Sequence, residues 1–236
     1  MKRLTKPRFI FVYPLAIALF LFGRTTELQF RLGVLLVCCG EMLRLWANGY
    51  VGQVKVNWTQ KNRGEAKIGR LVTAGPYAFV RHPLYLGTFI IGAGFCTMMG
   101  NWWLSLLAMI FFLFIYGAKM RTENHLLLHE CGEQYSTYAA KVPQWIPRFN
   151  RHPNPQGRWT WQGILASKEL KTVVWVTVCL LVVYFREEYF QEHELFGPKV
   201  WGKHLVLTVF LLLLIASDGT FELWRRLRRQ QTEAMA

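Results

Sequence analysis

The stretch that decides the fold is residues 75–87, which read Gly75-Pro76-Tyr77-Ala78-Phe79-Val80-Arg81-His82-Pro83-Leu84-Tyr85-Leu86-Gly87. It stands where a basic loop meets an apolar run. Each proline lacks an amide hydrogen and pushes the residue before it out of helical geometry. We therefore expect a structured turn from Gly75 to Pro83, followed by a helix that begins at Pro83, because proline suits the first helical position.

The polar side chains of this stretch favour a small-molecule site over a plain membrane anchor. Free amides at the helix start, together with the guanidinium of Arg81, would attract an anion such as a carboxylate. His82 offers a hydrogen-bond donor or acceptor at the same place. Tyr77 and Tyr85 could stack on a heterocycle or mark the membrane interface. An aromatic belt accounts for the tyrosines alone, but not for the whole cluster.

The composition of the chain predicts a membrane protein. Its 236 residues are 53% hydrophobic and 15% aromatic, and they still carry a net charge of +14. The basic residues come in short blocks between long apolar runs, which is typical of contact with anionic lipid headgroups rather than with nucleic acid. The five cysteines are scattered without a CxxC or Cys/His pair. The sequence therefore predicts no metal site.

Six apolar runs are close to the length of about 17–25 residues that crosses a bilayer. They are residues 9–23, 29–50, 83–100, 102–118, 169–185 and 202–217. Most of the 28 Lys and Arg residues lie before the first run, in the second and fourth loops, and after the last run. By the positive-inside rule, both termini are cytoplasmic. We expect an all-α, polytopic membrane helical bundle of about six transmembrane helices, with its small-molecule site on the cytoplasmic face.

The chain divides into three predicted parts. Residues 1–148 hold four spans, two cytoplasmic loops and the unusual polar residues. Residues 149–168 are polar and rich in turn formers, which indicates a cytoplasmic linker. Residues 169–236 form a two-span extension, whose Leu- and Val-rich runs favour packing or oligomerisation. The polar chemistry of the chain is therefore expected in the first part.

Two pairs of charged residues each share a helical face near the expected site. Glu41 and Arg44 are three residues apart inside the second run, where charges are costly. They either snorkel into the headgroups or border the site. Lys119 and Glu123 are one turn apart in the amphipathic helix that leaves the fourth run. This second pair faces the same cytoplasmic boundary as His82.

Two blocks of the sequence resemble the signature of the isoprenylcysteine carboxyl methyltransferase family. The first block is Leu71-Val72-Thr73-Ala74-Gly75-Pro76-Tyr77 with the Arg81–Gly87 string, and the second is Arg121-Thr122-Glu123, Gly132-Glu133, Tyr135, Tyr138 and Val142-Pro143. The resemblance covers roughly residues 40–148. It implies a helical integral membrane enzyme that uses S-adenosylmethionine. The lack of the GxGxG loop of soluble methyltransferases is consistent with this fold.

The resemblance also implies roles for individual residues. The positions that match the family's cofactor contacts, or lie within the same segments, are Arg70, Leu71, Val72, Tyr77, His82, Pro83, Leu84, Tyr85 and Glu123. Glu123 would hold the ammonium of the cofactor, and the His82–Tyr85 turn would hold its carboxylate and sugar. We expect Lys119, Arg81 and Arg44 to face the substrate. Lys119 stands where the family usually has an arginine, and Asn124 where it has a second glutamate.

These features predict methyl transfer to a membrane-soluble lipid or prenyl-type substrate, with carboxyl O-methylation as the leading interpretation. The methyl group of a sulfonium is already activated, so the enzyme mainly aligns the reactants and excludes water. No catalytic residue is therefore assigned. Three alternatives stay open: a phospholipid headgroup N-methyltransferase, an NADPH-dependent membrane reductase and a non-enzymatic lipid-binding scaffold. The expected partners are a lipophilic or lipidated substrate and membrane lipids, not nucleic acid.

Overall fold

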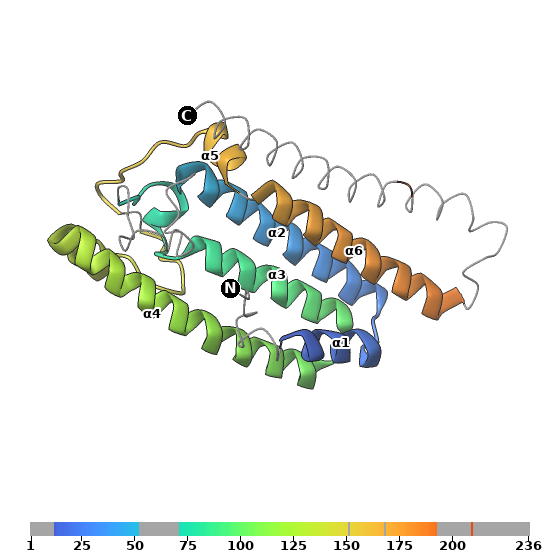
Figure 1. Cartoon of the computed structure of the whole chain (residues 1–236). Helices are drawn as coiled ribbons and strands as arrows, with labels where there is room; N and C mark the ends of the chain where they lie inside the picture. Colours follow the sequence, from blue (N-terminus) through green and yellow to red (C-terminus); the bar gives the residue numbers. More distant parts are fainter. Residues whose placement is uncertain (1–11, 52–70, 151, 168, 193–208, 210–236) are drawn as a thin grey trace, which may run out of the picture. The chain divides into compact units, whose positions relative to one another are not determined.

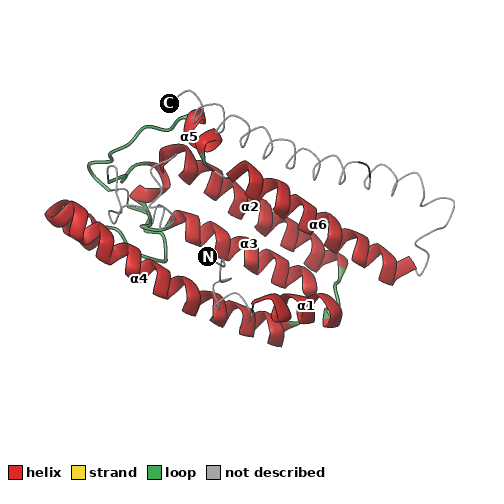
Figure 2. Cartoon of the chain, in the orientation of Figure 1, coloured by secondary structure: helices red, strands yellow, loops and turns green. Residues whose placement is uncertain are grey.

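Helices make up the regular structure of the part of the chain that the computed structural model describes. This part comprises residues 12–51, 71–150, 152–167, 169–192 and 209. Its elements are α1 (Val12–Phe22), α2 (Glu27–Val51), the 3-10 turn η2 (Gly75–Ala78), α3 (Pro83–Met99), α4 (Trp102–Lys141), α5 (Trp161–Ala166) and α6 (Glu169–Glu192). No strand occurs among these residues (Figure 2). The all-α prediction is confirmed for them.

The chain folds as two compact units, residues 1–169 and residues 170–236. The first unit contains α1 to α5 and the first residue of α6, and α3 lies between α2 and α4 (Figure 1). In the second unit, the structure describes the remainder of α6 and residue 209. The predicted boundaries after residues 148 and 168 stay predictions.

Glycines bring α2 and α3 into close backbone contact. A Cβ atom added to Gly40 of α2 would lie 2.7 Å from the carbonyl oxygen of Gly87, and one added to Gly94 of α3 would lie 2.7 Å from that of Gly33. Both distances are too short for a real Cβ contact. Small residues allow this approach, as is common between membrane helices. We call this contact the α2–α3 seam.

Helix α3 begins and ends at the residues that its sequence favours. Its first residue is Pro83, as predicted. It ends before Gly100, whose φ of 63° is left-handed and therefore suits a glycine cap. The next helix begins directly afterwards, because the side chain of Asn101 accepts a hydrogen bond of 3.2 Å from the amide of Leu104. The tight connection sets α3 and α4 next to each other.

Among the described residues, α4 is the one helix that is both long and apolar enough to cross a membrane, and α3 is a shorter apolar helix. Only 6% of the apolar window of α4 is buried inside the protein. This exposure agrees with contact between the helix and lipid. Of the predicted run 202–217, only residue 209 is among the described residues. The multi-pass arrangement stays a prediction.

A glycine interrupts α4 near its end. Gly132 has φ 51° and ψ −124°, which is not helical, so the last turns after it take a new direction. These turns carry Tyr135 and Tyr138, both of which are buried together with Val142. The kink therefore brings two tyrosines onto the polar end of α3 and η2.

The segment that follows α4 pairs with the segment before α3. Backbone hydrogen bonds of 2.9 to 3.1 Å join Arg81 to Pro143, Arg148 to Phe79, His152 to Ala78, and Thr73 to Gln156. His152 of the predicted linker is thus bonded to the Gly75–Gly87 stretch, and Gln156 is bonded to Thr73 just before it. This pairing fixes the backbone around the candidate site.

Candidate functional site

The first turn of α3 and the middle of α4 bring Tyr85, His82 and Glu123 together. The hydroxyl of Tyr85 donates a hydrogen bond to Oε1 of Glu123. The other carboxylate oxygen, Oε2, lies 3.7 Å from Nδ1 of His82. The histidine side chain is buried, whereas 24% of the glutamate side chain is exposed. The carboxylate can therefore still be reached by a ligand.

His82 is a neutral ring with a defined hydrogen-bond pattern. Its Nε2 lies 2.9 Å from Oδ1 of Asn124, and because an amide oxygen only accepts, Nε2 carries the hydrogen. Burial lowers the pKa of His82 from 6.5 to about 4, although the bond to Asn124 opposes this shift. Nδ1 is then an acceptor that faces a second acceptor, Glu123. A ligand group with N–H donors, such as an ammonium, would satisfy both.

Asn124 connects His82 to the end of α4. Its Oδ1 also accepts a hydrogen bond of 2.5 Å from the hydroxyl of Tyr135, and its Nδ2 donates to Oε1 of Gln144 at 3.2 Å. The side-chain oxygen and nitrogen of Asn124 therefore both have hydrogen-bond partners. The sequence could not reveal Gln144 as a partner, because it lies 20 residues away in an irregular segment.

Lys119 lies beside the Tyr85–Glu123 contact. Its Nζ is 4.8 Å from the ring centroid of Tyr85 and 5.8 Å from that of Tyr116. A cation over a tyrosine face is attracted by the ring quadrupole. The arrangement places one positive charge where α3 and α4 meet.

Arg81 supplies a second cationic group with a vacant donor. Its Nη1 lies 3.5 Å from the hydroxyl of Tyr135, and its Nε is buried without a hydrogen-bond partner in the described part of the chain. A buried donor without an acceptor is costly unless a ligand supplies one. A carboxylate is the group that a guanidinium binds best.

The remaining predicted cofactor residues line the same end of the bundle. Leu71 packs against the buried cluster of Tyr135, Tyr138 and Val142. The carbonyl oxygen of Tyr77 accepts a hydrogen bond of 2.7 Å from Tyr138, and burial raises the pKa of the Tyr77 hydroxyl. Val72 is half-buried, and Pro83 and Leu84 belong to the first turn of α3. Arg70 lies outside the described residues.

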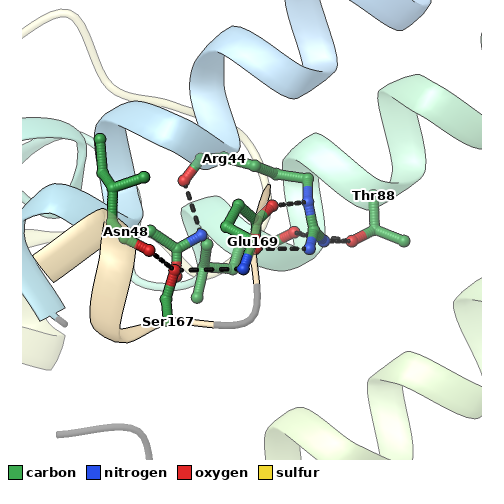
Figure 3. A network of polar contacts seen from close by, with 7 residues as sticks. Arg44, Asn48, Thr88, Ser167 and Glu169 are labelled. Carbon is green, nitrogen blue, oxygen red and sulfur yellow. Dashed lines mark hydrogen bonds and ion pairs between the residues drawn. The ribbon is translucent and has the colours of Figure 1, made fainter. Parts of the chain in front are cut away.

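Arg44 reaches the first turn of α3, but its charge is matched inside the protein. Its Nε donates to Oε1 of Glu169 at 2.6 Å, and its Nη2 donates to Oε2 at 3.0 Å (Figure 3). Its Nη1 donates to Oγ1 of Thr88 and lies 3.4 Å from the carbonyl oxygen of Leu84. The predicted neighbour Glu41 is buried, and neither of its carboxylate oxygens has a hydrogen-bond partner among the described residues. Glu169, not Glu41, is therefore the hydrogen-bonded ion-pair partner of Arg44.

Sequence reasoning missed Glu169, which is 125 residues from Arg44. One physical argument could have pointed to Glu169. An arginine inside an apolar run needs a counter-charge. Glu169 is the first residue of the predicted run 169–185, so it was a candidate for that counter-charge. In the described residues, no group of three or more His, Cys, Asp or Glu side chains could hold a metal ion.

Comparisons with known proteins find similarity over the segment that carries these residues. The family model of the isoprenylcysteine carboxyl methyltransferase (ICMT) family matches residues 33–129. Protein-S-isoprenylcysteine O-methyltransferase of Schizosaccharomyces pombe is 34% identical over 111 residues, which are 47% of this chain and 46% of that protein. Protein-S-isoprenylcysteine O-methyltransferase B of Arabidopsis thaliana is 30% identical over 118 residues, 50% of this chain and 59% of that protein.

A bacterial relative carries a different name. The cobalt-zinc-cadmium resistance protein CzcN of Cupriavidus metallidurans is 28% identical over 160 residues, 67% of each chain. No solved structure matches the chain significantly. The chain spans about half the length of the first curated relatives that it matches. The segment that is similar to the isoprenylcysteine carboxyl methyltransferase family, residues 33–129, contains Tyr85, His82 and Glu123.

Proposed function

We propose that this protein is a membrane methyltransferase that transfers a methyl group from S-adenosylmethionine to the carboxylate of a prenylated cysteine or a similar lipidic acid. The observation that carries the proposal is the Tyr85–Glu123–His82 contact, with the cation of Lys119 over the ring of Tyr85. Support comes from the family match and from the two relatives that are named protein-S-isoprenylcysteine O-methyltransferases.

The vacant donors and acceptors of the site fit the amino-acid end of the cofactor. Glu123 and the Nδ1 atom of His82 are acceptors 3.7 Å apart, and they would bind the ammonium. The buried Nε of Arg81 lacks an acceptor among the described residues, so this arginine would bind the carboxylate of the cofactor rather than face the substrate. Leu71, Val72 and Tyr77 would line the remainder of the cofactor site. When bound, S-adenosylmethionine supplies a methyl group that the sulfonium has already activated.

The residues of the chain then have to orient the acceptor and exclude water. Lys119 would hold the carboxylate of the substrate next to Tyr85, because its charge stands at the meeting point of α3 and α4. An ionised carboxylate is already nucleophilic, so the site needs no general base. Orientation in a dry site lowers the barrier by removing translational freedom and hydration.

The surroundings of the site suit a lipid substrate. Only 6% of the apolar window of α4 is buried inside the protein, so a prenyl chain could approach it from the bilayer. We propose a multi-pass topology with both termini in the cytoplasm, which puts Glu123 and His82 at the cytoplasmic face. The cofactor would enter there from water. A site at this boundary can receive both molecules.

Cofactor binding is the first test. Calorimetric titration of the purified protein with S-adenosylmethionine should give saturable binding, which Glu123→Gln should weaken about 100-fold because it removes a charged partner of the ammonium. Glu130→Gln changes another glutamate of the same helix, outside the site, and should leave the dissociation constant unchanged. Binding of NADPH without binding of S-adenosylmethionine would refute the proposal.

The chemical nature of the product is the second test. Protein in nanodiscs receives methyl-labelled S-adenosylmethionine and either N-acetyl-S-farnesylcysteine or phosphatidylethanolamine. A base-labile label on the prenylcysteine indicates a carboxyl ester and supports the proposal. A base-stable label on the phospholipid indicates N-methylation and contradicts it.

A further inference from the structure

The Arg44–Glu169 pair joins the first residue of α6 to the first turn of α3. Glu169 is only 1% exposed, and the side chain of Arg44 is 15% exposed. Two hydrogen bonds link the guanidinium to the carboxylate (Figure 3). Burial of this kind is tolerated only when both charges are matched and hydrogen-bonded. Each partner therefore depends on the other.

Glu169 is held in place independently of Arg44. Its amide donates a hydrogen bond of 3.2 Å to Oγ of Ser167, whose hydroxyl donates to the carbonyl of Ile164 at 2.7 Å. Helix α5, which contains Ile164, packs closely on α2. A Cβ atom on Gly163 would lie 2.8 Å from the carbonyl oxygen of Gly49. The backbone of Glu169 is thus held in place, and from there its carboxylate orients the arginine.

Arg44 links Glu169 to helix α3. Its Nη1 donates to Oγ1 of Thr88 and approaches the carbonyl oxygen of Leu84. Leu84 and Thr88 precede and follow Tyr85, whose hydroxyl binds Glu123. The hydroxyl of Thr88 also donates to the carbonyl of Leu84 at 2.9 Å. Arg44 therefore contacts the turn that carries the tyrosine of the candidate cofactor site.

Glu41 provides a competing partner for Arg44. It lies three residues earlier on α2, so it shares a helical face with the arginine, and its buried oxygens have no hydrogen-bond partner in the described part of the chain. Without the carboxylate of Glu169, the flexible arginine side chain could turn towards Glu41. It would then leave Thr88 and Leu84.

We propose that Glu169 is a positioning residue for the cofactor site. It holds Arg44 against Leu84 and Thr88, and thereby holds the hydroxyl of Tyr85 against Glu123. The inference rests on the proposed function for what this turn binds. It also gives the first residue of the C-terminal extension a role in the methyltransferase core.

The test uses Glu169→Gln in the full-length protein and two measurements. Calorimetry should show S-adenosylmethionine binding weakened about 5- to 10-fold. Hydrogen exchange of the ligand-free protein should show faster exchange of the Tyr85 and Leu86 amides, which bond to the carbonyl of His82. The matched control is Glu27→Gln, which breaks an exposed Glu–Arg pair on α2 and should change neither quantity.

A double-mutant cycle separates positioning from a general loss of stability. If Glu169 acts through Arg44, Arg44→Gln should weaken binding by a similar factor, and the double variant should lose no more than Arg44→Gln alone. Adding Glu41→Gln to Glu169→Gln should restore part of the lost affinity, because it removes the competing carboxylate. Additive losses in the cycle would overturn the proposal.

Two further outcomes complete the design. If Glu169→Gln does not fold, Thr88→Val replaces it. This substitution removes only the contact on α3 and should weaken binding about threefold with faster exchange of Tyr85 and Leu86. Unchanged exchange in the folded variant would overturn the positioning role. If the wild type binds no S-adenosylmethionine, the proposed function fails, while faster exchange in Glu169→Gln would still support the positioning of the turn.

Discussion

The α2–α3 seam and the cluster around Glu123 both use helix α3, but different forces hold them together. Glycines bring the backbones of the seam into direct contact, with Gly40 against Gly87 and Gly33 against Gly94. The cluster is polar, and each side chain in it is fixed by hydrogen bonds to others. A seam of this kind tolerates no added atom, whereas the cluster tolerates changes of size better than changes of donor and acceptor. Substitutions that add volume should therefore affect the seam most, and substitutions that remove a donor or acceptor should affect the cluster most.

The largest effect is expected at the seam. A methyl group at Gly94 would lie 2.7 Å from the carbonyl oxygen of Gly33 and 2.8 Å from a methyl of Val37, so the helices must separate. Gly94→Ala should destabilise the protein by about 3 kcal/mol, the upper range of overpacking. Gly92→Ala on the same helix meets only Met109 at 3.5 Å and serves as the control. Thermal unfolding in detergent measures both, and equal melting temperatures would contradict the close seam.

The next effect concerns the kink that delivers Tyr135 and Tyr138 to the cluster. Gly132 has φ 51° but no atom within 4 Å of an added Cβ, so a substitution there strains the backbone without a clash. Gly132→Ala should cost about 2 kcal/mol and weaken cofactor binding. Gly117→Ala, in the same helix, has its nearest neighbour at 3.8 Å and should be neutral or stabilising. A helix that stays fully stable in Gly132→Ala would show that the kink is not required.

The acid sensitivity of the cluster should come from His82. Because burial lowers its pKa from 6.5 to about 4, the unfolded chain binds a proton in this pH range that the folded protein does not. Stability is therefore lost as the pH falls below about 6.5, by about 2 kcal/mol at pH 5. His82→Gln should remove this part of the pH dependence, whereas His129→Gln, at an exposed position, should not. Thermal melting curves recorded from about pH 4 to about pH 8 measure the stability of both variants and of the wild type.

The smallest effect is expected at Asn124, where two substitutions test whether its side-chain oxygen is needed as a hydrogen-bond acceptor. Asn124→Leu deprives His82 and Tyr135 of their shared acceptor, and we expect about tenfold weaker binding of S-adenosylmethionine. Asn124→Asp keeps the acceptor oxygen and should stay within about threefold of the wild type. Titration calorimetry compares them, and nitrogen NMR of the His82 ring reports whether Nε2 still carries the hydrogen. Equal affinities of the two variants would argue against this role of Asn124.

Local signals in the sequence were sufficient for much of the fold. Pro83 predicts the start of α3, and the apolar run after Glu27 predicts α2, because both depend on residues that are close in sequence. The kink at Gly132 was not foreseen. A glycine inside a helical pattern is often tolerated, and only the packing of Tyr135 and Tyr138 distinguishes a bend from a straight helix.

For the candidate site too, some residues could be predicted from the sequence and others could not. The spacing of Lys119 and Glu123 places them on one face, and the family's motifs add Tyr85 and His82. The partners that fix these side chains could not be foreseen, because Glu169 and Gln144 lie far from the residues they bind. The sequence shows that an arginine inside an apolar run needs a counter-charge, but it does not show which carboxylate supplies it.

The pairing of Thr73 with Gln156 has a consequence for the order in which the protein is made. Thr73 and Gln156 are 83 positions apart. The ion pair of Arg44 can form only after Glu169, 125 positions later, has been synthesised. The α2–α3 seam can form as soon as its two helices have been synthesised, because it needs nothing that follows Met99. Contacts between distant residues form late, since long loops close slowly. A growing chain would therefore acquire its helical framework first and its polar site only after synthesis has passed the start of α6.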